Sequence, residues 1–407
     1  MKTLFQIGCL WLILLCEIKA IYGSSLTAGN TKNLDHVSIS LLTLGSDEFL
    51  YSSWGHSTLR VRDDLNGTDI TYNWGVFDQN SPLFLWRFIK ETLPYKLDVL
   101  PTKYYLGFLL KLNDRRVVED KIILNDEQKK NLLKKLSWWM KPENQYYRYH
   151  SYKDNCSTQI RDLLNETLNN QIKDKYENRK TSQSWRTYWQ DYFLHWPITK
   201  FAGDLVFNKK IDKKISAWEE MFIPDKLREH LISYGIASPA KVWVDIPALQ
   251  TPGISAITWF SILFLIPVGL FIRGTAKNSK RLIRISLALL CLIWGCFSGV
   301  FGFTIAFISL FTERDYFHFG ANSWILIILD WWLIWPSWKL LRNQTINTKI
   351  LEKIGIIHLM GVAAYLVLWA AGSIEQDITI PMQSIVPACI IFSIILIFVE
   401  RRKKLVS

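Results

Sequence analysis

Hydrophobic and polar positions divide this chain into two parts with different patterns. Residues 24–252 contain short apolar runs among many charged residues, whereas residues 253–407 consist of long apolar runs joined by polar loops. Short alternating runs are typical of strands and amphipathic helices, and long runs are typical of membrane-spanning helices. The pattern predicts an α+β globular domain over 24–252, followed by an all-α membrane domain over 253–407.

Several short segments of the globular part alternate apolar and polar residues, as half-buried strands do. Asn66-Gly67 is a favourable hairpin turn between two of these segments. The predicted strands are 37–44, 49–51, 57–63, 69–77, 106–112, 117–124 and 146–149.

Helix signals lie between these strands. Asn125 with Gln128 three residues later forms a capping box, and Asn155 is a favourable N-cap directly before Cys156. A further helix is predicted over 84–91. Aromatic side chains recur on one helical face of 184–196, which indicates either packing within the domain or contact with a membrane interface.

Five apolar segments in the second part approach the ~20 residues that a helix needs to span a bilayer. They are 254–272, 285–311, 323–338, 354–371 and 384–399. A multi-pass membrane domain of five helices is therefore expected.

The loops between these segments differ in charge, and this difference predicts orientation. Loops 273–284 and 339–353 and the tail 401–404 are rich in Lys and Arg, while the alternate loops carry Glu313 and Glu375 with neighbouring acids. Positively charged loops face the cytoplasm. Five spans then place the C-terminus in the cytoplasm and the globular domain outside the membrane.

Residues 1–23 indicate the same export. Their apolar core after Lys2 is typical of a secretory signal peptide, or of an uncleaved anchor. Much of the net charge of +12 lies in and beside the membrane part, while Lys and Arg nearly balance Asp and Glu in 24–252. The charge therefore concerns topology, and nucleic acid is not an expected partner.

Cys156 is the one cysteine between the signal and the apolar segments. A lone exported thiol is either buried and inert or kept for its reactivity. A helix N-terminus and a nearby imidazole both lower the pKa of a thiol. Cys156 has the first from its position, and His56 is the candidate for the second.

The predicted chemistry is nucleophilic attack by a Cys156 thiolate on a carbonyl carbon. His56 would act as base and then as acid, and the backbone N–H groups at the helix start would bind the oxyanion. A third group usually orients the imidazole, and Asn73 is the first candidate, with Asp154 the alternative. Asn155, Tyr72 and Arg60 are possible supporting residues.

Three polar residues of the membrane part are further candidates. Asp330 lies inside the third apolar segment, where a carboxylate indicates either a functional role or a contact between helices. His318 and Asn322 precede it at the outer side, and they either face the catalytic domain or are simply interfacial. No phosphate-binding glycine loop, zinc-ligand spacing or Gly-x-Ser-x-Gly motif occurs, so no cofactor or metal is expected.

The segments 54–61, 72–75 and 155–158, followed by 161–162 and 222–225, resemble the bacterial lipoprotein N-acyltransferase family Lnb. His before Cys in the chain also resembles circularly permuted papain-like acyltransferases, which implies that fold here.

The resemblance implies an enzyme of the bacterial inner membrane with its N-terminal domain in the periplasm. It would move an acyl chain from a phospholipid to Cys156 as a thioester, and then to the α-amine of a diacylglyceryl lipoprotein. The sequence departs from the family pattern at Glu313-Arg314, where an Asp-His pair is usual.

Two other functions fit the same residues. A thiol peptidase or amidase acting on peptidoglycan would also use Cys156 and His56. A non-enzymatic membrane scaffold would need neither side chain.

Overall fold

A computed structural model describes residues 33–402, apart from 79–81, 84–85, 88–89, 91 and 248–254. The predicted signal at 1–23 and most of the expected helix over 84–91 lie outside the described residues. The described chain forms two compact units, and each is treated by itself. The first combines 33–183 with 214–247, and the second combines Ser184–Lys213 with 255–402.

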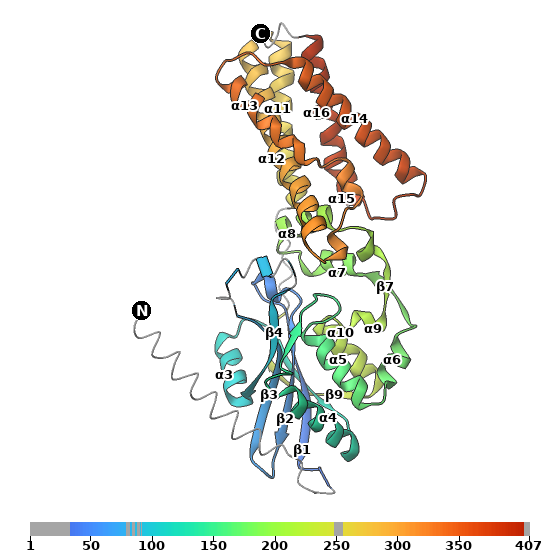
Figure 1. The fold of residues 1–407 in the computed structure, drawn as a ribbon. Coiled ribbons are helices and arrows are strands. Elements are labelled where there is room, and N and C mark those ends of the chain that lie inside the picture. The colour runs from blue at the N-terminus through green and yellow to red at the C-terminus, as the bar shows by residue number, and fades with distance from the viewer. Residues whose placement is uncertain are drawn as a thin grey trace. The chain divides into compact units, whose positions relative to one another are not determined.

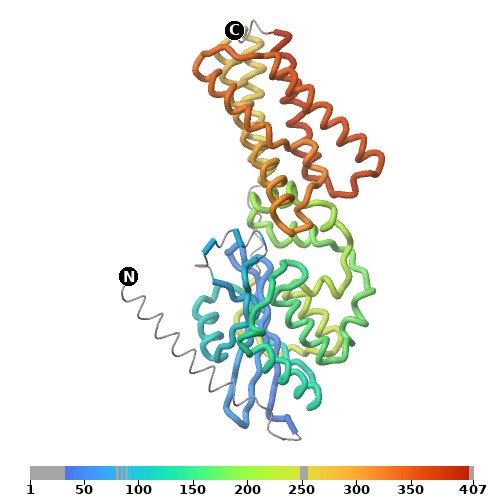
Figure 2. The backbone as a smooth tube through the Cα atoms, viewed as in Figure 1, coloured from blue at the N-terminus to red at the C-terminus, as the bar shows by residue number. Residues whose placement is uncertain are grey.

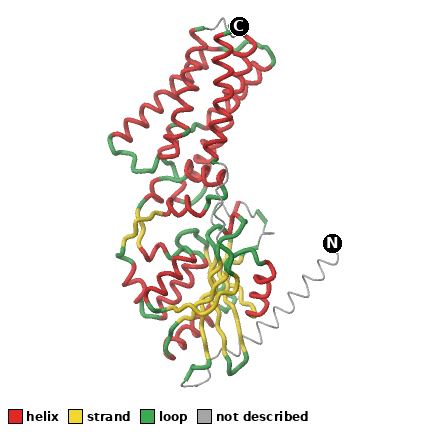
Figure 3. The backbone as a smooth tube through the Cα atoms, turned by 180° about the vertical axis from the view of Figure 1, so that it is seen from behind, coloured by secondary structure: helices red, strands yellow, loops and turns green. Residues whose placement is uncertain are grey.

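The first unit is built on a seven-stranded sheet in which every pairing is antiparallel (Figures 1 and 3). The strand order is β6-β4-β3-β2-β1-β5-β9. The strands are β1 (Val37–Leu44), β2 (His56–Asp63), β3 (Thr68–Val76), β4 (Pro94–Pro101), β5 (Val117–Ile122), β6 (Tyr146–Arg148) and β9 (Ala237–Val244). β7 (Lys180–Ser184) and β8 (Lys214–Ser216) form a separate two-stranded sheet.

Helices cover both faces of the large sheet (Figure 1). Alternate residues such as Leu59, Tyr72 and Trp74 pack against the helices of one face, and Leu42 and Leu44 pack against α3 on the other. The helices of this unit are α3 (Thr102–Leu112), α4 (Asp126–Trp139), α5 (Cys156–Thr167), α6 (Gln171–Tyr176), α9 (Ala217–Glu220) and α10 (Pro224–Tyr234). The α+β class predicted for this domain is confirmed.

Two predicted strands are wrong. Residues 106–112 belong to α3, because Leu106 and Leu109 are buried one helical turn apart and Asn113 ends the helix in a left-handed conformation. Residues 49–51 lead into a 3₁₀ turn at Leu50–Ser52, whose apolar side chains are exposed. The sequence pattern did not predict β4 and β9.

The second unit is helical (Figure 2). Its helices are α7 (Trp185–Tyr192), α8 (Pro197–Val206), α11 (Ala256–Ala276), α12 (Lys280–Phe311), α13 (Ile334–Leu341), α14 (Thr348–Ala370), α15 (Thr379–Gln383) and α16 (Ile385–Arg401). Of the five expected spans, α11, α12 and α14 are confirmed as helices long and apolar enough to cross a membrane.

The other two expected spans are not among these long apolar helices. Residues 323–338 are divided among 3₁₀ turns at Ala321–Trp324 and Ile328–Leu333 and the start of α13. Backbone atoms of this broken segment lie against Gly295 and Gly302 of α12, where a Cβ would come within 3.0 Å of them. α16 is continuous but has 17 residues.

Residues Ser184–Lys213 belong to the helical unit, although they lie between two parts of the α+β unit in the sequence. Phe201 of α8 packs on Phe260 and Phe297 of the long helices. Asn208 Nδ2 donates hydrogen bonds to the carbonyls of Asp315 and His318, at 2.7 and 2.9 Å. The aromatic segment 184–196 therefore lies in a part of the chain that packs on the membrane helices.

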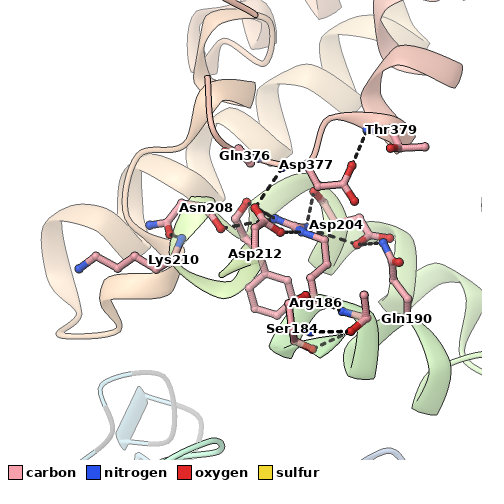
Figure 4. A network of polar contacts seen from close by, with 12 residues as sticks. Ser184, Arg186, Gln190, Asp204, Asn208, Lys210, Asp212, Gln376, Asp377 and Thr379 are labelled. Carbon is pink, nitrogen blue, oxygen red and sulfur yellow. Dashed lines mark hydrogen bonds and ion pairs between the residues drawn. The ribbon is translucent and has the colours of Figure 1, made fainter. Parts of the chain in front are cut away.

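Arg186 holds this inserted segment together (Figure 4). Its guanidinium is 2% exposed, forms two hydrogen bonds with Asp212 and lies 3.4 Å from Asp204 Oδ1. Asp212 in turn accepts the backbone N–H of Asp377, which follows α14. A single buried cation thus joins three segments that are distant in the sequence.

Replacing Arg186 with Met should lower the unfolding free energy in detergent by about 3–5 kcal/mol, because the buried Asp204 and the 11% exposed Asp212 lose their counter-ion. Lys210→Met is the matched control, since Lys210 and its partner Asp315 are 53% and 43% exposed and such a pair contributes about 1 kcal/mol or less. Denaturant-induced unfolding followed by tryptophan fluorescence measures both. Equal effects of the two changes would contradict this account of Arg186.

Candidate active site

His56 begins β2 on the face of the sheet opposite Leu59 and Val61, which belong to the core around α5. Gly55 directly before it has φ +79°, and a Cβ there would lie 2.4 Å from the carbonyl oxygen of Leu44. Only glycine fits that approach. The tight turn at Gly55 therefore fixes where the imidazole enters the site.

Asn73 lies on the neighbouring strand β3, on the same face of the sheet as His56. Its Oδ1 is 2.7 Å from His56 Nε2. An amide oxygen only accepts hydrogen bonds, so Nε2 carries the proton of the neutral ring. Nδ1 is then the nitrogen that can take a proton from a thiol, as the prediction for His56 requires.

Cys156 is the first residue of α5, and the cap before it sets its position. Asn155 Oδ1 accepts the backbone N–H groups of Ser157 and Thr158, both at 3.0 Å. The Thr158 hydroxyl accepts the N–H of Asn155 at 2.7 Å, which completes a capping box. The same Asn155 donates to the carbonyl of Phe222 at 3.0 Å and so ties the helix start to the turn before α10.

Burial raises the pKa of the Cys156 thiol, but His56 lowers it by its charge and by a hydrogen bond. Hydrogen bonds from the Ser57 N–H and the Ser157 hydroxyl act in the same direction, and the net shift of the pKa is downward. For His56, burial lowers the pKa, while Cys156 and then Asn73 raise it, with a net upward shift. The two shifts together favour a thiolate–imidazolium pair.

Gly75 faces both reactive groups. A Cβ added there would lie 3.7 Å from His56 Cε1, 3.8 Å from Cys156 Cβ and 3.9 Å from the hydroxyl of Tyr147. Gly75 has φ +104° and lies where the register of β3 and β4 shifts, as in a β-bulge. Bulges are common beside active sites, where they redirect strands. Three side chains from β2, β6 and α5 thus converge on one small space.

The predicted oxyanion site needs a correction. The N–H groups of Ser157 and Thr158 already donate to the Asn155 side chain. The cap leaves the N–H of Cys156 itself as the donor at this helix end that it does not engage.

Asp154, the alternative residue for orienting the His56 ring, lies in the turn before α5. Its carboxylate accepts a hydrogen bond from the amide of Gln159, and its backbone pairs with His150 in the turn before α5. Burial raises the pKa of Asp154 to about 6. The structure brings Asn73 to His56 and gives Asp154 a role in the turn.

Tyr72 and Arg60 hold the sheet. Tyr72 is fully buried in the core under α4 and α5, with its hydroxyl 3.7 Å from the sulfur of Met140. Arg60 forms paired hydrogen bonds with Asp69 on the adjacent strand β3 and with Glu119 on β5, which lies beyond β1. Arg60 lies on the same strand as His56, and Tyr72 lies on the same strand as Asn73. Their contacts therefore stabilise the two strands that carry the site.

The candidates of the membrane part make contacts within the helical unit. Asp330 is buried, accepts a hydrogen bond from Trp294 Nε1 at 3.2 Å and lies 3.0 Å from His358 Nε2. Asn322 donates to the carbonyl of Leu205 at 2.8 Å. His318 Nε2 lies 3.1 Å from the carbonyl of Thr312. The contacts of Asp330 and Asn322 join the broken segment 321–333 to its neighbours.

Sequence reasoning did not single out four residues of the site: Ser57, Gly75, Arg115 and Tyr147. Arg115 forms an ion pair with Asp47, and its charge opposes the upward shift of the His56 pKa. Gly75 had a local signal, because a glycine that interrupts an alternating strand often marks a bulge. No local sequence signal indicates Tyr147, because its position in the site depends on the pairing of β6 with β4.

The arrangement defines a class of site: a thiol at a helix start, an imidazole on a strand and an amide that orients the imidazole. No group of three or more His, Cys, Asp or Glu residues that could hold a metal occurs within the part of the chain that the structure describes.

Residues 27–190 match the family described as the Lnb N-terminal periplasmic domain. The matched region contains His56, Asn73 and Cys156, and the resemblance to the Lnb family is confirmed. Together with the long apolar helices, the match identifies a membrane protein with a periplasmic N-terminal domain. The chain matches no curated protein and no solved structure.

Alkylation of Cys156 by iodoacetamide should be fast at neutral pH, since His56 keeps the thiol pKa low. In His56→Ala only burial and the weaker hydrogen bonds remain, so the pKa rises and reactivity moves to higher pH. Each unit of pKa lowers the thiolate fraction at pH 7 about tenfold. Mass spectrometry of the Cys156 peptide across pH measures this, with His36→Ala as the control. An unchanged profile in His56→Ala would refute the coupling.

Gly75→Ala should strongly reduce the activity of Cys156 as a nucleophile toward iodoacetamide, because its methyl group enters the space between Cys156, His56 and Tyr147. Gly67→Ala is the matched control: Gly67 has φ +65°, but nothing lies within 4 Å of an added Cβ. Both changes impose a backbone strain of about 1–3 kcal/mol. A similar loss of activity in both variants, measured at equal folded amounts, would show that strain alone is responsible.

Proposed function

We propose that this protein is a lipoprotein N-acyltransferase of the Lnb type. The observation that carries the proposal is the Cys156–His56–Asn73 arrangement inside a domain that matches the Lnb N-terminal periplasmic domain. The acyl donor is a phospholipid, and the acceptor is the α-amine of a diacylglyceryl-cysteine at the N-terminus of a lipoprotein.

In the first half-reaction the Cys156 thiolate attacks the ester carbonyl carbon of the phospholipid. The resulting tetrahedral intermediate collapses, the ester C–O bond breaks, and the leaving alkoxide takes a proton from His56. The product is an acyl thioester on Cys156 and a lysophospholipid.

In the second half-reaction the amine of the lipoprotein attacks the thioester carbonyl carbon. The amine gives a proton to His56 Nδ1, the C–S bond breaks, and the thiolate of Cys156 is restored. Asn73 holds Nε2–H throughout, so the same ring nitrogen serves as acid and as base.

The helical unit supports this assignment of substrates. Both substrates are lipid-anchored, and an enzyme tied to the membrane meets them at the bilayer surface. We infer the inner membrane as the location, a multi-pass topology with a cytoplasmic C-terminus, and a circularly permuted papain-like architecture for the catalytic unit. The basic loops 273–284 and 339–353 and the order of His56 before Cys156 support these inferences.

Purified full-length protein incubated with phospholipid vesicles should gain the mass of one fatty acyl group on Cys156. Intact-protein and peptide mass spectrometry measure the gain, which hydroxylamine should remove because it cleaves thioesters. Cys156→Ser and His56→Ala should lose N-acylation of lipoproteins in cells, by more than about a hundredfold.

The control is Cys296→Ser, since Cys296 is an exposed thiol of the helical unit. That variant should keep both the acyl mass and the N-acylation. Release of amines from peptidoglycan without any acyl-Cys156 would instead favour the peptidase. Normal N-acylation by Cys156→Ser at equal abundance would refute the proposal.

A further inference from the structure

Acyl transfer through a thioester passes through two tetrahedral intermediates, each with a negatively charged oxygen. Such an oxygen is usually stabilised by two hydrogen-bond donors that are already in place. At the start of α5 the cap engages the N–H groups of Ser157 and Thr158, and the N–H of Cys156 is the donor it leaves. A second donor must come from another element.

Tyr147 of β6 has a hydroxyl group near Cys156, where the second hydrogen-bond donor is needed. Its oxygen is buried and has no hydrogen-bond partner among the described residues. It lies within 4 Å of the same point beside Gly75 as His56 Cε1 and Cys156 Cβ. The hydroxyl therefore borders the space in which a carbonyl bound to Cys156 would lie.

The packing of the Tyr147 ring does not explain why this residue carries a hydroxyl group. The ring of Tyr147 contacts Tyr95 and Trp139, with centroids 6.2 and 6.4 Å apart, and a phenylalanine would keep both contacts. A buried hydroxyl without a partner costs about 1–3 kcal/mol. A buried polar group without a partner calls for an explanation, and a catalytic role is one such explanation.

The hydroxyl also keeps its proton. Burial raises the pKa of Tyr147 well above its ordinary value, and negative charge on Cys156 raises it further. Tyr147 is thus a hydrogen-bond donor at every step, and it does not compete with His56 as a proton acceptor.

We propose that the Tyr147 hydroxyl, together with the N–H of Cys156, donates a hydrogen bond to the oxyanion in both half-reactions. No proton is transferred from Tyr147: the carbonyl π electrons move to oxygen when sulfur or nitrogen attacks, and return when the leaving group departs. The inference rests on the proposed acyl transfer, and it assigns Tyr147 a catalytic role that the sequence did not suggest.

The test compares two reactions of Cys156 in full-length Tyr147→Phe. Acylation forms an oxyanion, whereas alkylation by iodoacetamide forms none. Acylation by phospholipid vesicles and by p-nitrophenyl butyrate should fall about a hundredfold at saturating donor, while the alkylation rate at each pH stays within about twofold of the wild type. Tyr146→Phe, on the same strand but 59% exposed, is the control and should change neither reaction.

Unchanged acylation in Tyr147→Phe would overturn the inference. An equal fall in acylation and alkylation, with the melting temperature of the wild type, would also overturn it, because Tyr147 would then act on the thiol itself. If Tyr147→Phe proves unstable, Tyr147→Met with an intact alkylation profile replaces it.

The activated ester separates this inference from the proposed function. Wild-type protein that is acylated by p-nitrophenyl butyrate but not by phospholipid would refute the phospholipid donor, and the effect of Tyr147→Phe on the ester would still decide the role of Tyr147.

Discussion

The side chain of Asn155 is the constraint on which the site depends. Its oxygen caps α5 through Ser157 and Thr158, and its amide group donates to the carbonyls of Ser151 and Phe222. All the hydrogen-bonding capacity of a 5% exposed side chain is directed at three separate parts of the backbone. Cys156 is therefore held at a helix end that cannot shift without breaking contacts to the turn before it and to the segment before α10.

Once the thiol is held there, two opposing effects decide its ionisation. Burial disfavours the thiolate, and the charge of His56 with short-range donors favours it. Neither partner would be reactive alone, because a buried thiol or imidazole without its partner prefers the neutral form. The sheet supplies the second half of the arrangement: Gly55 turns His56 into the site, and Asn73 on the adjacent strand orients its ring.

Local signals predicted the parts of the fold that local interactions determine. The capping box at Asn125, the N-cap at Asn155 and the hairpin at Asn66 depend on residues a few positions apart, and Cys156 was predicted at a helix start for that reason. The leucine-rich run 106–112 fits a short strand as well as a helix, and only its burial against the sheet decides. Strands β4 and β6 pair with segments far along the chain, so the convergence of Tyr147 on Gly75 could not be read from sequence. The same holds for 323–338, whose composition suits a span, whereas its backbone packs closely against α12 and is divided among 3₁₀ turns and a short helix.

The cap also limits the chemistry of the helix end. A helix start offers unsatisfied N–H groups both to a capping side chain and to a developing oxyanion, and each group can serve one of them well. Asn155 accepts the N–H groups of Ser157 and Thr158, which fixes the position of Cys156. The same two N–H groups are then no longer available as donors to an oxyanion. A site built this way needs a donor from outside the helix. The buried hydroxyl of Tyr147, which has no structural partner among the described residues and borders the space between Cys156 and His56, meets that need.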